Sequence, residues 1–311
     1  MNILLLALVP ACFALNPVIG RAMADVFGPA SLSVVRWSGS ALVIALLARG
    51  EIGARRAPLG VTARLAGLGI LGMGFCAYAA FIGAHTSTAT NVSLIYGCTP
   101  AFVAVWEISS GRQRAKASLA LGIAGCLLGV VLILTQGHLE ALRNMRFVPG
   151  DLWAAAGMFA FVVYTVAMRR VSSGLGPLSQ FTLMASAATL ALAPVAALEV
   201  AADGWPALQM RALPWIAALV LATGIGAYLG YNVSLKRNGP VLTSASIALT
   251  PMYAAMLAVV LIGERLAWYH GVALVLVVCG LMLINRGQAA PPAAAPATAA
   301  GSPRAGNSSA T

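Results

Sequence analysis

The feature that most constrains this chain is a series of ten long apolar runs separated by short polar connections. The runs lie near residues 3–20, 31–48, 65–84, 91–108, 118–136, 152–168, 178–199, 214–234, 241–262 and 268–285. Each is close to the ~20 residues that an α-helix needs to cross the hydrocarbon core of a bilayer. They are about twice as long as a barrel strand and do not alternate polar with apolar residues, which argues against a β-barrel.

The composition points the same way. Of the 311 residues, 60% are hydrophobic and only 9% are charged, and the mean hydropathy is +0.89. Such a chain has too little polar surface to cover a soluble globule. The predicted fold is therefore an all-α integral membrane protein with ten transmembrane helices.

The distribution of basic residues predicts the orientation of these helices. With a cytoplasmic N-terminus, the inner side receives Arg49, Arg55, Arg56, Arg64, Arg112, Arg114, Lys116, Arg169, Arg170, Lys236, Arg237, Arg286 and Arg304. The outer side receives Arg21, Arg143, Arg146, Arg211 and Arg265. Because cytoplasmic loops are enriched in Lys and Arg, both termini are predicted to be cytoplasmic. Topology and anionic lipid headgroups explain the net charge of +11, so no nucleic acid partner is required.

An internal repeat relates the two halves of the chain. Residues 91–107 (NVSLIYGCTPAFVAVWE) recur as residues 242–258 (LTSASIALTPMYAAMLA), with Thr99-Pro100 matched by Thr250-Pro251. Further matches, such as Phe13 with Phe161, occur in the same order along the chain at offsets between 148 and 151. The predicted units are a first five-helix repeat (1–136), a connecting loop (137–151), a second five-helix repeat (152–286) and a disordered tail (287–311).

The number of helices in each unit predicts a mechanism. Five is odd, so the second unit must enter the membrane upside down relative to the first, which gives an inverted repeat. Two similar halves of opposite orientation can exchange conformations, so that one cavity opens to each side in turn. The solute is then expected near the midplane between the halves, and the predicted activity is secondary transport by alternating access.

Three prolines inside the runs predict helix breaks at such a path. Pro17, Pro100 and Pro251 each remove a backbone donor and free a carbonyl group that must find another partner. Polar side chains stand directly beside them, namely Asn16, Thr99 and Thr250. These residues are candidates for solute binding and gating, although packing kinks are also common in membrane helices.

Further candidates for a polar or aromatic cavity wall lie within the runs. They are Tyr78, Tyr96, Tyr228, Tyr231, Asn232, Ser244 and Tyr253. A buried phenol usually needs a hydrogen-bond partner, and several of them together suggest a pocket for an apolar or aromatic solute. Ordinary packing between helices and weak interhelical hydrogen bonds are the alternative.

Arg36 has the highest free-energy cost of insertion into the membrane, because an arginine facing lipid near the bilayer centre costs about 2.5 kcal/mol or more. It is expected to face protein or water, either as an anchor for a carboxylate or as a brace that binds backbone carbonyls. The remaining titratable candidates, His85, Glu107 and Glu199, are expected at the solvated ends of spans. Proton coupling through a buried acid is therefore disfavoured.

Several other patterns are assigned to packing. The GxGxxG pattern of residues 67–72 lies in an apolar run with no acidic partner, so it predicts close helix contact, as do the pairs Gly125–Gly129 and Gly226–Gly230. The five cysteines show no metal-ligand spacing and are expected to be free. No Walker lysine, HExxH or GxSxG occurs, so the sequence indicates neither an ATP-driven pump nor a hydrolase, and no cofactor or metal is expected.

These residues resemble the EamA-type transporters of the drug/metabolite transporter superfamily, which are ten-helix bacterial exporters. The resemblance rests on Asn16-Pro17-Val18, on Gly28-Pro29 followed by Arg36-Trp37, on both Thr-Pro pairs and on Gly263-Glu264. The first repeat has Gly111-Arg112 in place of a Gly-Glu pair, so any role of that glutamate does not extend to the first half. The resemblance implies export of amino acids, related metabolites or drugs across a bacterial inner membrane.

The leading hypothesis is a secondary transporter that exports amino acids or similar small metabolites, with a small solute and the lipid bilayer as partners and one chain as the expected unit. Multidrug efflux of hydrophobic or cationic compounds is the alternative within transport. A membrane-embedded enzyme would require clustered His, Asp or Glu at one membrane face, which the sequence lacks, and a non-transporting scaffold would show no counterflow.

Overall fold

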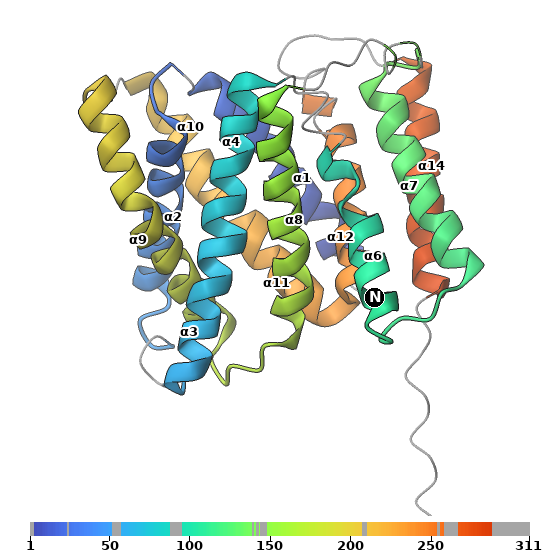
Figure 1. Ribbon diagram of the computed structural model, residues 1–311, viewed down its shortest axis with the longest axis horizontal. Coiled ribbons are helices and arrows are strands. Elements are labelled where there is room, and N and C mark those ends of the chain that lie inside the picture. The colour runs from blue at the N-terminus through green and yellow to red at the C-terminus, as the bar shows by residue number, and fades with distance from the viewer. Residues whose placement is uncertain are drawn as a thin grey trace, which may run out of the picture.

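The fold was described from a computed structural model covering residues 3–23, 25–51, 57–87, 95–138, 140, 143, 148–206, 210–253, 256–257 and 267–287. Within these residues all regular elements are helices and no strand occurs (Figure 1). The α-helices are α1 (Ile3–Ala22), α2 (Pro29–Leu47), α3 (Leu59–Leu68), α4 (Cys76–Thr86), α6 (Thr99–Ser109), α7 (Ala117–Leu134), α8 (Pro149–Arg170), α9 (Pro177–Asp203), α10 (Leu213–Ala218), α11 (Ala227–Asn238), α12 (Pro240–Ser246) and α14 (Trp268–Gly287). Between them lie the π-helical segments η1 (Gly69–Phe75) and η4 (Leu219–Gly226) and the 3-10 segments η3 (Met210–Ala212) and η5 (Ile247–Leu249).

Seven of the expected spans coincide with helices that are long and apolar enough to cross a membrane. These are 3–20, 29–47, 59–83, 149–170, 177–203, 210–238 and 268–287, and a shorter apolar helix covers 117–132. The fourth and ninth expected runs include residues outside the described part of the chain. Nearly all of the expected tail also lies outside it. The all-helical membrane class is therefore confirmed, and the number of ten spans stays a prediction.

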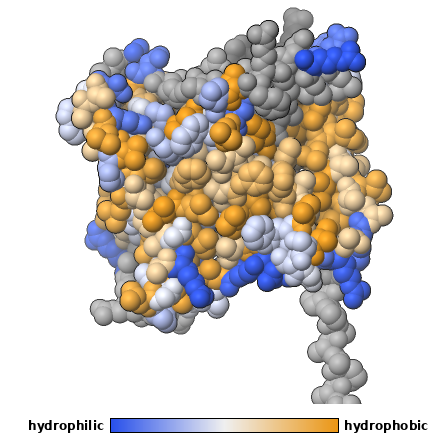
Figure 2. Space-filling view, in the orientation of Figure 1, coloured by the Kyte–Doolittle hydropathy of each residue, from blue (hydrophilic) through white to orange (hydrophobic). Residues whose placement is uncertain are grey.

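The surface carries an apolar band across its middle, with hydrophilic residues gathered along its upper and lower edges (Figure 2). Large apolar side chains are exposed on the described surface, among them Leu47, Leu152, Leu190 and Leu198. In water this exposure would be unfavourable, whereas in a bilayer these side chains meet lipid tails of the same polarity.

Helices α2 and α9 pack against each other, and the start of α2 is capped by a side chain from α9. Glu199 lies in the last turns of α9, and its carboxylate accepts hydrogen bonds from the backbone N–H groups of Ala30 (2.9 Å) and Ser31 (2.8 Å) and from the Ser31 hydroxyl (2.9 Å). The first N–H groups of a helix have no partner within the helix, and an anion there also meets the positive end of the helix dipole. Glu199 is therefore a cap and not the freely solvated group that its position predicted.

The other end of the same helix pair has the reciprocal arrangement. Glu51, just beyond α2, accepts from the backbone N–H groups of Leu178 and Ser179 at the start of α9, both at 3.1 Å. Each capping glutamate stands 148 residues from its counterpart, which is the offset of the repeat in this region. Since the end of each helix contacts the start of the other, α2 and α9 run antiparallel.

Glycines bring the second prominent helix pair, α7 and α14, into close contact. A Cβ atom on Gly122 would lie 2.6 Å from the carbonyl oxygen of Gly280, and one on Gly129 would lie 2.6 Å from a methyl group of Val277. Gly125 faces the same helix. The packing role predicted for Gly125 and Gly129 is therefore confirmed, because larger side chains would force the helices apart.

The GxGxxG segment is also a packing element. Gly69 lies against the backbone of Met184 and Gly72 against the ring of Tyr164. Gly226 and Gly230 similarly face α1 through Cys12 and Val9, as predicted. Four of the five cysteines, Cys12, Cys76, Cys126 and Cys279, are free thiols.

The helix geometry changes at equivalent places in the two halves. The π-helical segments η1 and η4 begin 150 residues apart, and each leads into the helix that carries Ala77-Tyr78 or Ala227-Tyr228. A turn at Cys98 precedes the Thr99-Pro100 pair, and the 3-10 segment η5 precedes Thr250-Pro251. The weakened turns expected before these prolines are thus present, because proline offers no N–H to the preceding turn.

Candidate functional site

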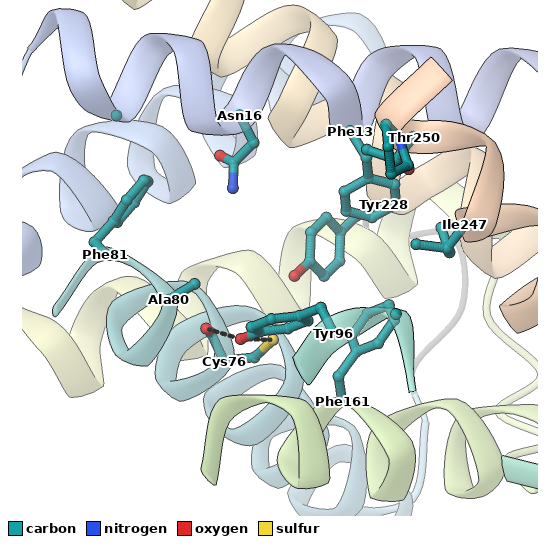
Figure 3. Close-up of a pocket in the computed structure, with 13 residues that line it drawn as sticks. Phe13, Asn16, Cys76, Ala80, Phe81, Tyr96, Phe161, Tyr228, Ile247 and Thr250 are labelled. Carbon is teal, nitrogen blue, oxygen red and sulfur yellow. Dashed lines mark hydrogen bonds between the residues drawn. The ribbon is translucent and has the colours of Figure 1, made fainter. Parts of the chain in front are cut away.

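A cavity of about 200 Å³ lies among helices from both halves of the chain (Figure 3). It is lined by Phe13, Asn16, Gly20, Cys76, Ala80, Phe81, Tyr96, Gly97, Phe161, Tyr228, Ile247, Thr250 and Pro251. The first eight belong to the first half and the last five to the second. The described lining contains no charged side chain.

Aromatic rings form much of the wall. Phe13 packs against Phe161 and Tyr228, with ring centroids 6.3 and 5.3 Å away, and Phe161 also packs against Tyr228 at 6.3 Å. The phenol groups are already engaged, because Tyr228 donates to the Gly72 carbonyl (3.1 Å) and Tyr96 to the Cys76 carbonyl (3.2 Å). The rings therefore offer the cavity mainly their apolar faces.

Two other polar side chains retain hydrogen-bonding capacity at the cavity. Thr250 lines it, and its buried Oγ1 has no hydrogen-bond partner in the described structure. Asn16 accepts a hydrogen bond at Oδ1, while its Nδ2 group makes none to the described residues. In Figure 3 the Asn16 side chain points from α1 into the space above Tyr228 and Ala80.

Arg36 lies directly behind this wall. It is 1% exposed and donates to Asn16 Oδ1 (3.0 Å) and to the Thr223 carbonyl (2.5 Å). Its guanidinium carbon lies 4.5 Å from the ring centroid of Trp37 and 5.3 Å from that of Tyr228. The structure therefore gives Arg36 the geometry of a brace, held by a carbonyl, an amide and two aromatic faces, and not of a side chain exposed in the cavity.

Five of the sequence-predicted site residues come together in the lining: Asn16, Tyr96, Tyr228, Thr250 and Pro251. They derive from four separate regions of the chain, which the fold brings together.

Several other predicted residues form hydrogen bonds in the packing around the cavity. Tyr231 shares a hydrogen bond with Thr165 (2.9 Å), and Asn232 accepts one from Tyr164 (2.6 Å). Asn232 also lines a second cavity of about 220 Å³, which includes Lys236.

Three further predicted residues lie in the broken helices. Thr99 donates to the Tyr96 carbonyl (2.6 Å), Ser244 donates to the Val241 carbonyl (3.0 Å), and Pro100 is buried at the start of α6. Pro17 belongs to α1, but its side chain is outside the described part, as is that of His85.

Tyr78 and Tyr253 lie away from the cavity lining. Cys76 and Ala80, one helical turn apart on α4, face the cavity, whereas Tyr78 between them points to the opposite side and packs against Trp153 at 6.3 Å. Two residues correspond to about 200° around a helix, which accounts for the difference. Tyr253 is half-buried outside the lining.

Phe81 and the pair Phe13 and Phe161 also line the cavity, although they are not among the residues predicted for the site. A signal for the pair was present, because the two phenylalanines match across the repeat at an offset of 148. Glu107, expected to be solvated, is 8% exposed and pairs with Arg170 at 3.2 Å. Among the described residues no cluster of His, Cys, Asp or Glu could hold a metal ion.

The family of this chain follows from its similarity to known protein families. The model of the EamA-like transporter family matches the chain twice, over residues 1–135 and 148–286. The chain belongs to the EamA-like transporter family. It is therefore a multi-pass membrane transporter of a small-molecule solute and not an enzyme.

Individual relatives of this EamA-like transporter agree with that assignment. The chain is 26% identical over 266 residues to the uncharacterized transporter YyaM of Bacillus subtilis, covering 82% of this chain and 84% of the relative. It is 24% identical over 211 residues to an uncharacterized transporter of Archaeoglobus fulgidus, covering 67% and 71%. A solved crystal structure, 19% identical, shares the fold with a TM-score of 0.67 over 88% of this chain and 93% of that chain.

Proposed function

We propose that this EamA-like transporter is a secondary exporter of amino acids or similar small metabolites with an apolar body, working by alternating access. The observation that carries the proposal is the cavity of about 200 Å³, which receives lining residues from both matched halves. A volume of that size suits a small organic solute. A site shared between two halves can change its access when they move against each other.

The proposed architecture is ten spans in two inverted five-helix repeats, with units 1–136 and 152–286 joined by 137–151 and followed by a tail. The reciprocal glutamate caps of α2 and α9 support it, because a two-fold axis in the membrane plane exchanges the two caps. The antiparallel α7–α14 pair, in which Gly122 meets Gly280 and Gly129 meets Ala273, supports it in the same way.

The orientation with both termini in the cytoplasm is supported by contacts along one end of the bundle. Arg170 at the end of α8 pairs with Glu107 of α6, Arg169 donates to the Leu235 carbonyl of α11, and Lys236 donates to Gln180 of α9. These contacts gather basic helix ends at one membrane face, where the positive-inside rule puts the cytoplasm.

The lining residues Asn16, Tyr96, Tyr228 and Thr250 are proposed to contact the solute. The breaks before Pro100 and Pro251, together with Pro17, are proposed to let the surrounding helices bend as the cavity changes access. Residues one layer further out, such as Tyr231 and Asn232, position the wall through their hydrogen bonds.

The test is counterflow into liposomes that contain the purified full-length protein, with labelled amino acids and hydrophobic cations as probes. Exchange of amino acids above the rate of protein-free liposomes is the expected result. Exchange of the cations alone would favour multidrug efflux, for which the aromatic lining is the supporting observation. The absence of exchange by any small solute would contradict the proposal.

A further inference from the structure

The charge distribution behind the cavity narrows the solute class, an inference that rests on the proposed function because it concerns the same cavity. Arg36 carries a full positive charge, since a guanidinium is not deprotonated in proteins. It contacts an amide oxygen, a backbone carbonyl and two aromatic faces, none of which carries a formal charge. In the described structure the ion pair is formed by Arg170 and Glu107 and does not include Arg36.

This charge is present in the first repeat and has no counterpart at the equivalent position of the second. At the offset of 148 that relates α2 to α9, the counterpart of Arg36 is Met184, which is buried and apolar. One nearby contact is equivalent in the two halves, because Gly224 packs on Ser40 as Gly74 packs on Ala188. Of this pair of equivalent positions, only the one in the first half therefore holds a cation.

The amide of Asn16 lies between this charge and the cavity, and Arg36 fixes its orientation. A guanidinium has only donors, so the atom that Arg36 Nη1 meets at 3.0 Å must be the Asn16 oxygen. The two N–H groups of Asn16 Nδ2 are then left for the cavity, which the unpartnered Oγ1 of Thr250 also lines. The free polar groups at this wall are therefore an oriented donor pair and a hydroxyl, backed by a positive charge.

We propose that the cavity selects a monocarboxylate with an aromatic or apolar body and discriminates against cations. The carboxylate accepts from Asn16 Nδ2 and from the Thr250 hydroxyl, and the body lies against Phe13, Phe161 and Tyr228. The rings provide no strong opposing attraction for a cation at Tyr228, because the Arg36 guanidinium already lies 5.3 Å from that ring centroid.

The size of the preference follows from the geometry. A carboxylate bound through Asn16 would lie about 7 Å from the guanidinium, and at an effective dielectric constant of about 20 the attraction between two such charges favours binding roughly 50-fold. A cation in the same place is disfavoured by the same factor. Allowing for water in the cavity, we expect at least a tenfold preference of carboxylate over amine.

The test uses three probes with one aromatic body and different charge: 3-phenylpropionate, phenylalanine and phenethylamine. Their affinities are measured on the purified full-length protein by quenching of tryptophan fluorescence, and their exchange by counterflow with protein-free liposomes subtracted. We expect 3-phenylpropionate to bind at least tenfold more tightly than phenethylamine. Equal or tighter binding of phenethylamine would overturn the inference.

The variant Asn16→Asp tests whether the Asn16 amide is what orients donors toward the cavity in front of the Arg36 charge. Its carboxylate would accept from Arg36, neutralise the charge and present no donors, so the preference for 3-phenylpropionate over phenethylamine should fall at least tenfold. Ser38→Ala, which removes an exposed hydroxyl bonded within α2, is the matched control and should keep the preference. If the Asn16→Asp protein folds and keeps the wild-type ratio of affinities for 3-phenylpropionate and phenethylamine, this role of Asn16 is refuted.

The outcomes separate the two proposals. If phenylalanine exchanges but phenethylamine is the preferred ligand, the transport function stands and the charge selection falls. If none of the three probes binds or exchanges, the function proposed for this cavity fails together with the inference. If the Asn16→Asp protein does not fold, the order of the three affinities on the wild-type protein still tests whether the cavity selects a carboxylate.

Discussion

The reciprocal caps of α2 and α9 allow a quantitative test of the pseudo-symmetric packing. Glu199→Gln removes the charge from a side chain that accepts three hydrogen bonds at 2.8–2.9 Å at the start of α2. Loss of an N-cap costs about 0.5–2 kcal/mol, and the interaction of the charge with the helix dipole adds about 0.3–1 kcal/mol. Since Glu199 is half-buried and the one side-chain oxygen of Gln can still accept hydrogen bonds, we expect a loss of about 1.5 kcal/mol.

The partner substitution should cost less. Glu51→Gln weakens two longer bonds of 3.1 Å that converge on one carboxylate oxygen, so about 1 kcal/mol is expected. The two glutamates lie at opposite ends of a 19-residue helix, which is about 28 Å long. At that separation the effects of the two substitutions should add in the double variant.

The assay is thermal unfolding of the purified protein in detergent, followed by a thiol-reactive dye or by tryptophan fluorescence. The expected order of midpoints is wild type, then Glu51→Gln, then Glu199→Gln, with the double variant lowest and each kcal/mol worth about 2–4 °C. The matched control is Asp203→Asn, which removes an exposed carboxylate four residues from Glu199. If Glu199→Gln lowers the midpoint no more than Asp203→Asn does, the capping argument is wrong.

Three other predictions concern packing, the buried charge and topology. Gly280→Leu should lower the unfolding midpoint strongly, because its Cβ would lie 2.6 Å from a carbonyl oxygen of α7, whereas Gly271→Ala has open space and should be tolerated; equal midpoints for both would contradict the close packing. Arg36→Lys should cost about 1–3 kcal/mol of stability and reduce transport, because one ammonium cannot keep both hydrogen bonds and the stacking on two rings. Because lysine keeps the positive charge, unchanged stability and counterflow would exclude a role that depends on the shape of the guanidinium. Single thiols engineered at Arg114 and Arg143 should react with a membrane-impermeant reagent from opposite sides, and reaction from the same side would reject the inverted repeat.

The sequence by itself determined that this protein lies in a membrane, the approximate extent of most spans and the presence of two similar halves. Long apolar runs are decisive because a backbone in lipid must satisfy its hydrogen bonds within helices. The Thr-Pro breaks and the glycine contacts were also predictable, since proline lacks an N–H group and glycine lacks a Cβ atom wherever they occur. Gly125 on α7 and η5 before Thr250 are examples.

The tertiary structure decided which side of each helix faces the interior. In water an apolar stripe marks that side, but in lipid both sides are apolar and the pattern carries little information. Tyr78 and Tyr228 are therefore equivalent in the sequence, yet one packs against Trp153 and the other lines the cavity. For the same reason the partners of Arg36 and Glu199 followed only from the fold, because each is met by a helix that is distant in the chain and chosen by packing.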